Sequence, residues 1–306
     1  MNEIRRQISL PATWLANCFS TVAELVKTAF SEQGCLKLSA LLPYAECSNQ
    51  ASTAFSFRRL AGFTFGIGTQ ALFAVTVVGL FSFLRYGAAR SSGSWILIDC
   101  LLALQFAIPH SLLLHPKTRS ALRRWVPTEF YGAFFCVCTC ISLWLIFAFW
   151  QRTTAVLWDL DGIAANVIVG CFLLSWGSML YSIHLTGLGF QTGWTQWMHW
   201  YQHKKMPRRD FVPRGAYQYL RHPVYLSFLG LIWFTPTMTL DHAVLTGIWT
   251  VYIGVGSVLK DRRIAFYLGE PYLSYMQKVP GYPLVAFGPL ARLHSPVTNS
   301  APPAQT

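Results

Sequence analysis

Charged residues are scarce in this chain of 306 residues. They make up 12% of it, whereas a soluble globular protein carries about 25%. Hydrophobic residues make up 53%, and the mean hydropathy is +0.38. Acidic residues are especially few: 12 Asp and Glu stand against 24 Lys and Arg, for a formal net charge of +12. In a soluble protein this surplus would suggest nucleic acid as a partner. Here the cations gather in loops between apolar runs, so we expect a lipid bilayer and no nucleic acid.

The chain also lacks a disulfide or metal framework. Of its eight cysteines, five lie inside apolar runs: Cys100, Cys136, Cys138, Cys140 and Cys171. Cys136 and Cys140 share a helix face at i, i+4 spacing, but no His or carboxylate stands beside them to complete a metal site. We expect these thiols to pack as small apolar groups and expect no bound metal.

The chain contains several long apolar runs. A bilayer core about 30 Å thick requires about 20 apolar residues as a helix, and six runs meet or approach that length. They are Phe63–Leu84, Trp95–Leu114, Phe130–Trp150, Ile163–Leu185, Val224–Leu240 and Ala243–Leu259. The fifth is short and contains Pro236, which predicts a tilt, kink or break there. The pattern predicts an all-α, polytopic integral membrane protein with about six transmembrane helices.

The loop charges predict an orientation. Fifteen Lys and Arg residues flank these runs on one side and three on the other. By the positive-inside rule, six spans then place both termini in the cytoplasm. Residues 1–55 hold a mildly apolar stretch interrupted by Glu24 and Lys27, which favours an interfacial amphipathic helix over a signal peptide. We expect residues 56–285 to form the membrane domain and residues 286–306 a disordered tail.

A polar segment, Gly215–Tyr225, stands where a basic loop meets the fifth apolar run. Arg221 and His222 precede Pro223, a residue that suits the first turn of a helix. A helix N-terminus attracts a carboxylate or phosphate, and an arginine adds bidentate recognition. The alternative is an ordinary cytoplasmic anchor of a transmembrane helix.

A second polar segment, Lys260-Asp261-Arg262-Arg263, follows the sixth run. Asp261 either compensates a basic flank whose side chains snorkel or pairs across the helices with Arg221 or Arg262. An aromatic stretch from Trp194 to Tyr201 precedes the fifth run. It is typical of an interfacial helix, and the alternative is a lid over a pocket.

These motifs resemble the isoprenylcysteine carboxyl methyltransferase superfamily, integral-membrane enzymes that use S-adenosylmethionine (SAM). The resemblance rests on Arg-His-Pro-x-Tyr at 221–225, the charged cluster at 260–263, Leu-Gly-Glu-x-Tyr-x-x-Tyr at 268–275 and Val-Pro at 279–280. It covers about residues 60–285. Within the superfamily the chain looks most similar to bacterial methanethiol S-methyltransferases and the related nurim and NnrU proteins.

The resemblance implies a cytoplasmic-side SAM pocket, mainly within residues 215–282, in a bacterial inner membrane. The residues implied to bind SAM are Tyr217, Arg221, His222, Pro223, Tyr225, Tyr272 and Tyr275. Arg221 would meet the SAM carboxylate or position the loop, and Tyr272 and Tyr275 would supply hydroxyls or aromatic faces. An aromatic face near the sulfonium would contribute about 0.5–2 kcal/mol.

The implied reaction is transfer of the SAM methyl group to a small thiol, above all methanethiol, which would become dimethyl sulfide. The thiolate is the nucleophile, so the thiol must lose its proton. His222, His110 and Asp261 are the candidate bases, and Arg262 is a candidate for stabilising the thiolate.

One departure from the superfamily pattern bears on activity. Members usually carry acidic residues where this chain has Lys260-Asp261. The alternatives are therefore another membrane-soluble acceptor, such as a prenylcysteine-like carboxylate, or a non-enzymatic membrane protein of the nurim type. NADPH-dependent sterol reductases share Arg-His-Pro-x-Tyr, but the shorter chain with six spans disfavours them.

Overall fold

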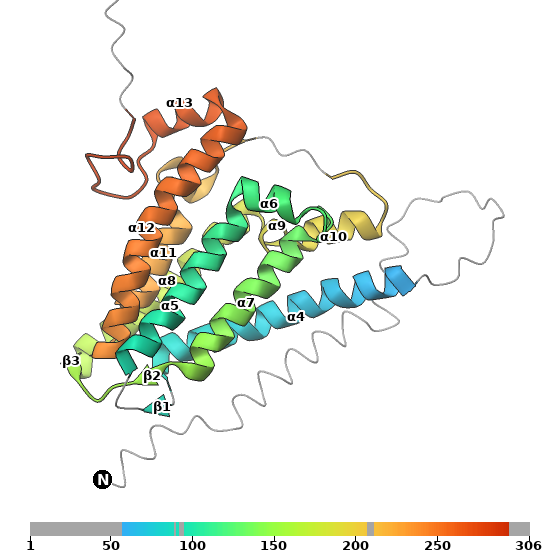
Figure 1. Cartoon of the computed structure of the whole chain (residues 1–306). Helices are drawn as coiled ribbons and strands as arrows, with labels where there is room; N and C mark the ends of the chain where they lie inside the picture. Colours follow the sequence, from blue (N-terminus) through green and yellow to red (C-terminus); the bar gives the residue numbers. More distant parts are fainter. Residues whose placement is uncertain (1–56, 89, 92–94, 207–210, 294–306) are drawn as a thin grey trace, which may run out of the picture. The chain divides into compact units, whose positions relative to one another are not determined.

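The computed structural model describes residues 57–88, 90–91, 95–206 and 211–293. Five helices in this part of the chain are long and apolar enough to cross a membrane. They are α4 (Phe57–Tyr86), α5 (Trp95–Leu114), α7 (Tyr131–Phe149), α8 (Gly162–Thr186) and α12 (Leu240–Leu268). The shortest, α7, has 19 residues, which at 1.5 Å per residue span about 29 Å. The prediction of an all-α, multi-pass integral membrane protein is confirmed (Figure 1).

The fifth apolar run forms only a short helix, α11 (Pro223–Trp233), of 11 residues. Its length is about 16 Å, about half of a bilayer core. The chain then passes Pro236 and enters β4 (Thr237–Thr239), which pairs antiparallel with β3 (Val156–Asp159). Of the tilt, kink or break predicted for this run at Pro236, the structure shows the break, since α11 ends at Trp233. The count of six spans therefore stays a prediction.

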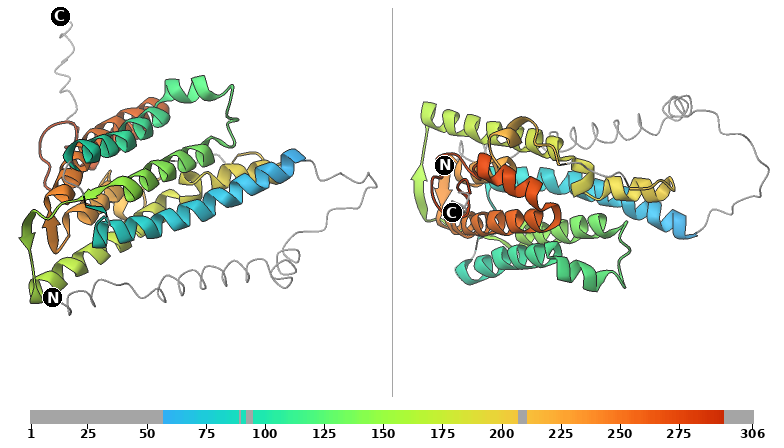
Figure 2. Two further views of the ribbon diagram at one scale, coloured as in Figure 1. Left: turned by 60° about the horizontal axis from the view of Figure 1, so that its bottom comes forward. Right: turned by 90° about the horizontal axis from the view of Figure 1, so that it is seen from above.

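The long helices and α11 pack side by side in the order α4, α7, α5, α12, α11, α8. Aromatic contacts between α4 and α8 close this order, since the Phe81 ring lies 5.5 Å from Phe172 and 5.7 Å from Trp176, centre to centre. The right view of Figure 2 shows α5 and α8 on opposite sides of α12.

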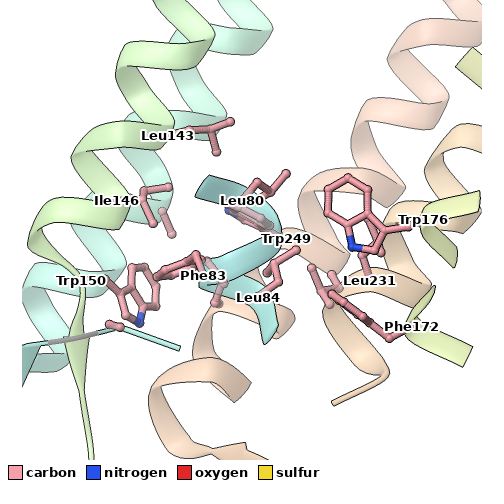
Figure 3. Close-up of a cluster of buried hydrophobic side chains, with 14 of the residues drawn as sticks. Leu80, Phe83, Leu84, Leu143, Ile146, Trp150, Phe172, Trp176, Leu231 and Trp249 are labelled. Carbon is pink, nitrogen blue, oxygen red and sulfur yellow. The ribbon is translucent and has the colours of Figure 1, made fainter. Parts of the chain in front are cut away.

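Large apolar side chains from several of these helices meet between them (Figure 3). They include Leu80, Phe83, Leu84, Leu143, Ile146, Phe172, Trp176, Leu231 and Trp249. Within a bilayer, helices associate through close packing rather than through the hydrophobic effect, so the shape of this cluster fixes their order. Cys136 and Cys140 are buried free thiols on α7, which confirms their prediction as small packing groups.

The two ends of the helices differ. At one end, β1 (Arg90–Ser91) lies parallel to β2 (Gln151–Arg152), near the β3–β4 pair. The other end carries short helices: α6 (Pro116–Leu122), α9 (Leu188–Gln191), α10 (Trp194–Tyr201), the 3₁₀-helix η1 (Gly215–Gln218) and α13 (Glu270–Lys278). This second end holds the start of α11 and the last turns of α12, and so the polar motifs (Figure 1).

The aromatic stretch before the fifth run forms α10, which is tied to α4 and α7. Trp197 is buried, and its Nε1 donates a hydrogen bond to the Gly62 carbonyl at 2.8 Å. Gly193, with φ +77°, begins α10 so close to α7 that a Cβ would lie 2.1 Å from the Ala133 nitrogen. A position at the membrane surface or over a pocket stays a prediction.

The predicted disordered tail is wrong over residues 286–293. The carbonyls of Pro289, Leu290 and Ala291 accept hydrogen bonds from the domain. Composition misses such contacts because a backbone acceptor leaves no signature in the sequence. The rest of the predicted tail and the predicted interfacial helix in residues 1–55 lie outside the described residues.

Candidate active site

Two motifs far apart in the chain are joined through their backbones just before α11. The Arg221 N–H donates to the Pro280 carbonyl at 2.9 Å, and the His222 N–H donates to the Gly281 carbonyl at 3.2 Å. Pro223 then begins α11, where its missing N–H costs no helical hydrogen bond. Arg-His-Pro and Val-Pro thus form one structural unit.

The N–H donors of the Arg221 guanidinium are used in hydrogen bonds within the protein. The side chain is buried, and its Nε donates to Asp261 Oδ2 at 3.0 Å. Its terminal nitrogens donate to four carbonyls at 2.7 to 3.3 Å, those of Met276, Val279, Pro289 and Ala291. A guanidinium has five N–H donors, so little capacity remains for a ligand. Of the two roles expected for Arg221, these contacts support positioning of the loop.

Asp261 of α12 is also buried, and both of its oxygens are engaged. Oδ2 accepts from Arg221, and Oδ1 accepts from the Tyr272 hydroxyl at 2.5 Å. The expected pairing of Asp261 with Arg221 is confirmed, and Arg262, the alternative partner, is exposed. Because a buried guanidinium is costly without a counter-charge, Asp261 is the group that allows Arg221 to be buried.

His222 is fully buried beside this pair. Its Nε2 lies 3.1 Å from Asp261 Oδ2, in close contact but not aligned as a hydrogen bond. Its Nδ1 has no hydrogen-bond partner among the described residues. The carboxylate favours the tautomer with the proton on Nε2, which leaves a free lone pair on Nδ1. Burial lowers the pKa of His222 although Asp261 opposes this shift, so the imidazole is neutral at pH 7.

Aromatic rings surround the imidazole. Tyr225 stacks on it with a centre-to-centre distance of 5.5 Å and an interplanar angle of 5°, and Tyr282 lies 5.6 Å away. The Tyr282 hydroxyl is 2.5 Å from Ser257 Oγ, and burial raises the pKa of Tyr282 to about 12. At Gly281 a Cβ would come within 3.2 Å of His222 Cδ2. These contacts fix the plane of the ring.

The remaining expected cofactor residues lie around this centre. The Tyr275 hydroxyl donates to the Tyr217 carbonyl at 2.5 Å, and burial raises the pKa of Tyr217 to about 12. Lys260 Nζ lies 4.9 Å from the centre of the Tyr225 ring and 5.9 Å from that of Tyr217. The hydroxyls of Tyr272 and Tyr275 thus have protein acceptors, while the rings of Tyr217 and Tyr225 face a cation.

Two of the four expected catalytic residues have other surroundings than His222 and Asp261. His110 of α5 has Nδ1 3.3 Å from Thr139 Oγ1, and its ring packs 4.8 Å from Phe135 and 5.4 Å from Phe106. Arg262 is exposed on α12. The structure therefore brings His222 and Asp261 together, and in the described part of the chain no hydrogen bond or ring contact joins His110 or Arg262 to either of them.

Two open cavities, each of about 470 Å³, lie away from the polar centre. One runs between α8 and α11 beside Ser178 and Gly230, and the other between α5 and α12 beside Ala107 and Tyr252. Their linings are apolar apart from a few hydroxyls, so they lack the groups that would hold a charged ligand. The polar geometry around His222 is the better guide to the site.

Sequence reasoning did not assign site roles to Gly281, Tyr282 and Ser257. The Val-Pro motif directly precedes Gly281 and Tyr282 and could have pointed to them. Nothing in the sequence marks Ser257, which lies in an apolar helix, as the partner of a tyrosine 25 residues later.

The chain is similar to several proteins named methanethiol S-methyltransferase. It is 28% identical over 236 residues to one from a Pseudomonas species, covering 72% of this chain and 89% of that protein. It is 27% identical over 233 residues to methanethiol S-methyltransferase 2 of Bradyrhizobium diazoefficiens, covering 73% and 90%. Nurim of Rattus norvegicus is 27% identical over 182 residues, covering 55% and 67%. No family model and no solved structure matches the chain.

These likenesses confirm the resemblance drawn from the motifs. They support a membrane-embedded methyltransferase, and at 25–28% identity they leave the acceptor open.

Proposed function

We propose that this protein is a SAM-dependent S-methyltransferase of a bacterial inner membrane that converts methanethiol to dimethyl sulfide. The observation that carries the proposal is the His222–Asp261 pair, a buried imidazole with a carboxylate 3.1 Å from Nε2 and, among the described residues, no hydrogen-bond partner at Nδ1. The names of the similar bacterial proteins support the choice of acceptor.

The residues around His222 fit SAM chemically. SAM carries a carboxylate, an ammonium, an adenine and a sulfonium. Tyr225 and Tyr217 offer ring faces that already accommodate a cation, and such a contact contributes about 0.5–2 kcal/mol to a bound sulfonium. The unpartnered Nδ1 of His222 is a buried polar atom that a ligand or substrate would satisfy. When bound, SAM supplies an electrophilic methyl carbon to a sulfur nucleophile held in line with it.

His222 would perform the proton transfer. A small thiol is mostly protonated at neutral pH, and its thiolate is the nucleophile. Nδ1 takes the proton as the S–H bond breaks, and the resulting imidazolium carries its other proton towards Asp261. Asp261 thus orients the ring and stabilises its charged form. Arg221 and Tyr272 hold Asp261 in place, and the burial of the pair keeps water from the thiolate.

Replacement of His222 separates binding from chemistry. In purified protein, His222→Gln should lower the rate of dimethyl sulfide formation about 10²–10⁴-fold, with SAM affinity changed by only about threefold. Headspace gas chromatography measures the product, and isothermal titration measures SAM binding. His203→Gln, at an exposed histidine, is the matched control and should behave as wild type. A His222→Gln protein that works at the wild-type rate contradicts the mechanism.

The non-enzymatic alternative rests on Lys260, which stands where the superfamily carries an acidic residue. It predicts that the wild-type protein binds no SAM. The same titration therefore separates the two functions.

A further inference from the structure

Lys260 holds a positive charge that the described part of the chain leaves without an anionic partner. Its Nζ lies over two aromatic faces, at 4.9 Å from the Tyr225 ring centre and 5.9 Å from that of Tyr217. Among the described residues, no hydrogen bond or ion pair involves this nitrogen. Asp261, the adjacent carboxylate, is taken by Arg221 and Tyr272. Three N–H donors of an ammonium are thus available to a ligand.

The charges around Lys260 favour an anion. The charged groups that act on it are Asp261 and Arg263, and Arg221 is bound to the same carboxylate. Three cations therefore stand against one anion. His222, which stacks on Tyr225, is neutral because burial lowers its pKa, and the neighbouring groups Tyr217, Tyr252 and Tyr282 are uncharged phenols. The centre carries a surplus of two positive charges, and a bound carboxylate would reduce it.

We propose that Lys260 binds the α-carboxylate of SAM. This inference rests on the proposed function and assigns the carboxylate to a residue other than Arg221, whose guanidinium donates to Asp261 and four carbonyls. An ammonium binds a carboxylate as a compact point charge with three donors, and a charge-assisted hydrogen bond is about twice as strong as a neutral one.

The same inference explains the departure at Lys260. An acidic residue at this position would attract the α-ammonium of the amino-acid group of SAM, whereas a lysine attracts its α-carboxylate. The substitution changes which half of that group is held and leaves the Tyr225 and Tyr217 faces in place for the sulfonium. Lys260 then joins His222 and Asp261 as part of the site.

Three ligands test this assignment in the full-length protein in detergent. S-adenosylhomocysteine has the carboxylate but no sulfonium, 5′-methylthioadenosine has neither, and SAM has both. Isothermal titration should show that Lys260→Gln weakens S-adenosylhomocysteine and SAM about 10–100-fold. The affinity for 5′-methylthioadenosine should stay within about threefold, which also shows that the variant is folded. Lys260→Arg should retain most of the affinity, and Lys278→Gln, an exposed lysine on α13, should match wild type.

Two results would overturn the assignment alone. One is that Lys260→Gln binds each of the three ligands with the same affinity as wild type. The other is a gain in SAM affinity without a gain for S-adenosylhomocysteine, which would show that the ammonium competes with the sulfonium for the aromatic faces. A wild-type protein that binds none of the three ligands overturns the proposed function and this inference with it.

Discussion

Loss of the Arg221 guanidinium should release the C-terminal segment that follows α13. Arg221→Met keeps the length of the side chain and removes its charge and all its donors. In the structure these donors contact Asp261 and the carbonyls of Met276, Val279, Pro289 and Ala291. The substitution therefore leaves one buried carboxylate and four carbonyls without this partner.

The magnitude follows from these contacts. Removal of one partner from a buried ion pair costs about 3–5 kcal/mol. For a domain of this size, each kcal/mol lowers the melting temperature by about 2–4 °C, so loss of the ion pair alone should lower it by roughly 6–20 °C. If the ion pair were the whole contribution, the apolar double variant Arg221→Met, Asp261→Leu would recover much of the loss. The four carbonyls predict that it will not, since each unsatisfied buried acceptor costs about 1–3 kcal/mol.

The assay combines thermal unfolding in detergent with limited proteolysis. Arg221→Met should melt at a lower temperature and should be cleaved between residues 279 and 293 before the rest of the domain is cut. Arg292→Ala, at an exposed arginine of the same segment, is the control for charge and should match wild type. A single variant with an unchanged melting temperature, or a double variant as stable as wild type, would refute the account of Arg221.

Three further predictions concern neighbouring features. Tyr272→Phe removes the donor to Asp261 Oδ1 and should cost about 1.5–3 kcal/mol in thermal unfolding; an unchanged midpoint would show that this hydrogen bond contributes no stability. Burial lowers the pKa of His222, so the unfolded chain takes up its proton near pH 6.5 and the folded protein only at lower pH. Stability should fall as the pH drops below about 6.5, and His222→Gln should reduce that slope; equal slopes would contradict the burial argument. Gly193→Ala should separate α10 from α7 and lower the melting temperature, because its Cβ would lie 2.1 Å from a backbone nitrogen. Gly170→Ala, with open space around it, is the control and should be neutral or slightly stabilising. Similar melting temperatures of the two variants would contradict this.

Apolar runs predicted the long helices because membrane-spanning segments leave a strong local signal. Five of the six runs form helices of spanning length. The fifth run, Val224–Leu240, ends its helix early because β4 pairs with β3, whose paired residues lie 78 to 83 positions apart, a tertiary contact that hydropathy does not record. The break itself was predictable from Pro236.

The residues of the candidate site were predictable from the sequence, but their hydrogen-bond and ion-pair partners were less so. Motif resemblance selected Arg221, His222 and Asp261, and the structure brings them together. The partners of Arg221 could not be predicted, because four of them are backbone carbonyls, and two of these, Pro289 and Ala291, belong to the segment that composition predicts to be disordered. Lys260 stood out in the sequence as a departure from the pattern. Only the positions of the Tyr225 and Tyr217 rings present it as a candidate ligand-binding residue.

Transfer of a labelled methyl group tests the central proposal most directly. Purified wild-type protein is incubated with methanethiol and with SAM carrying a trideuterated methyl group, and the headspace is analysed by gas chromatography with mass detection. The account predicts dimethyl sulfide with one trideuterated methyl group, formed by wild type and largely lost in His222→Gln. Labelled product no higher than in membranes from cells with an empty vector would contradict it.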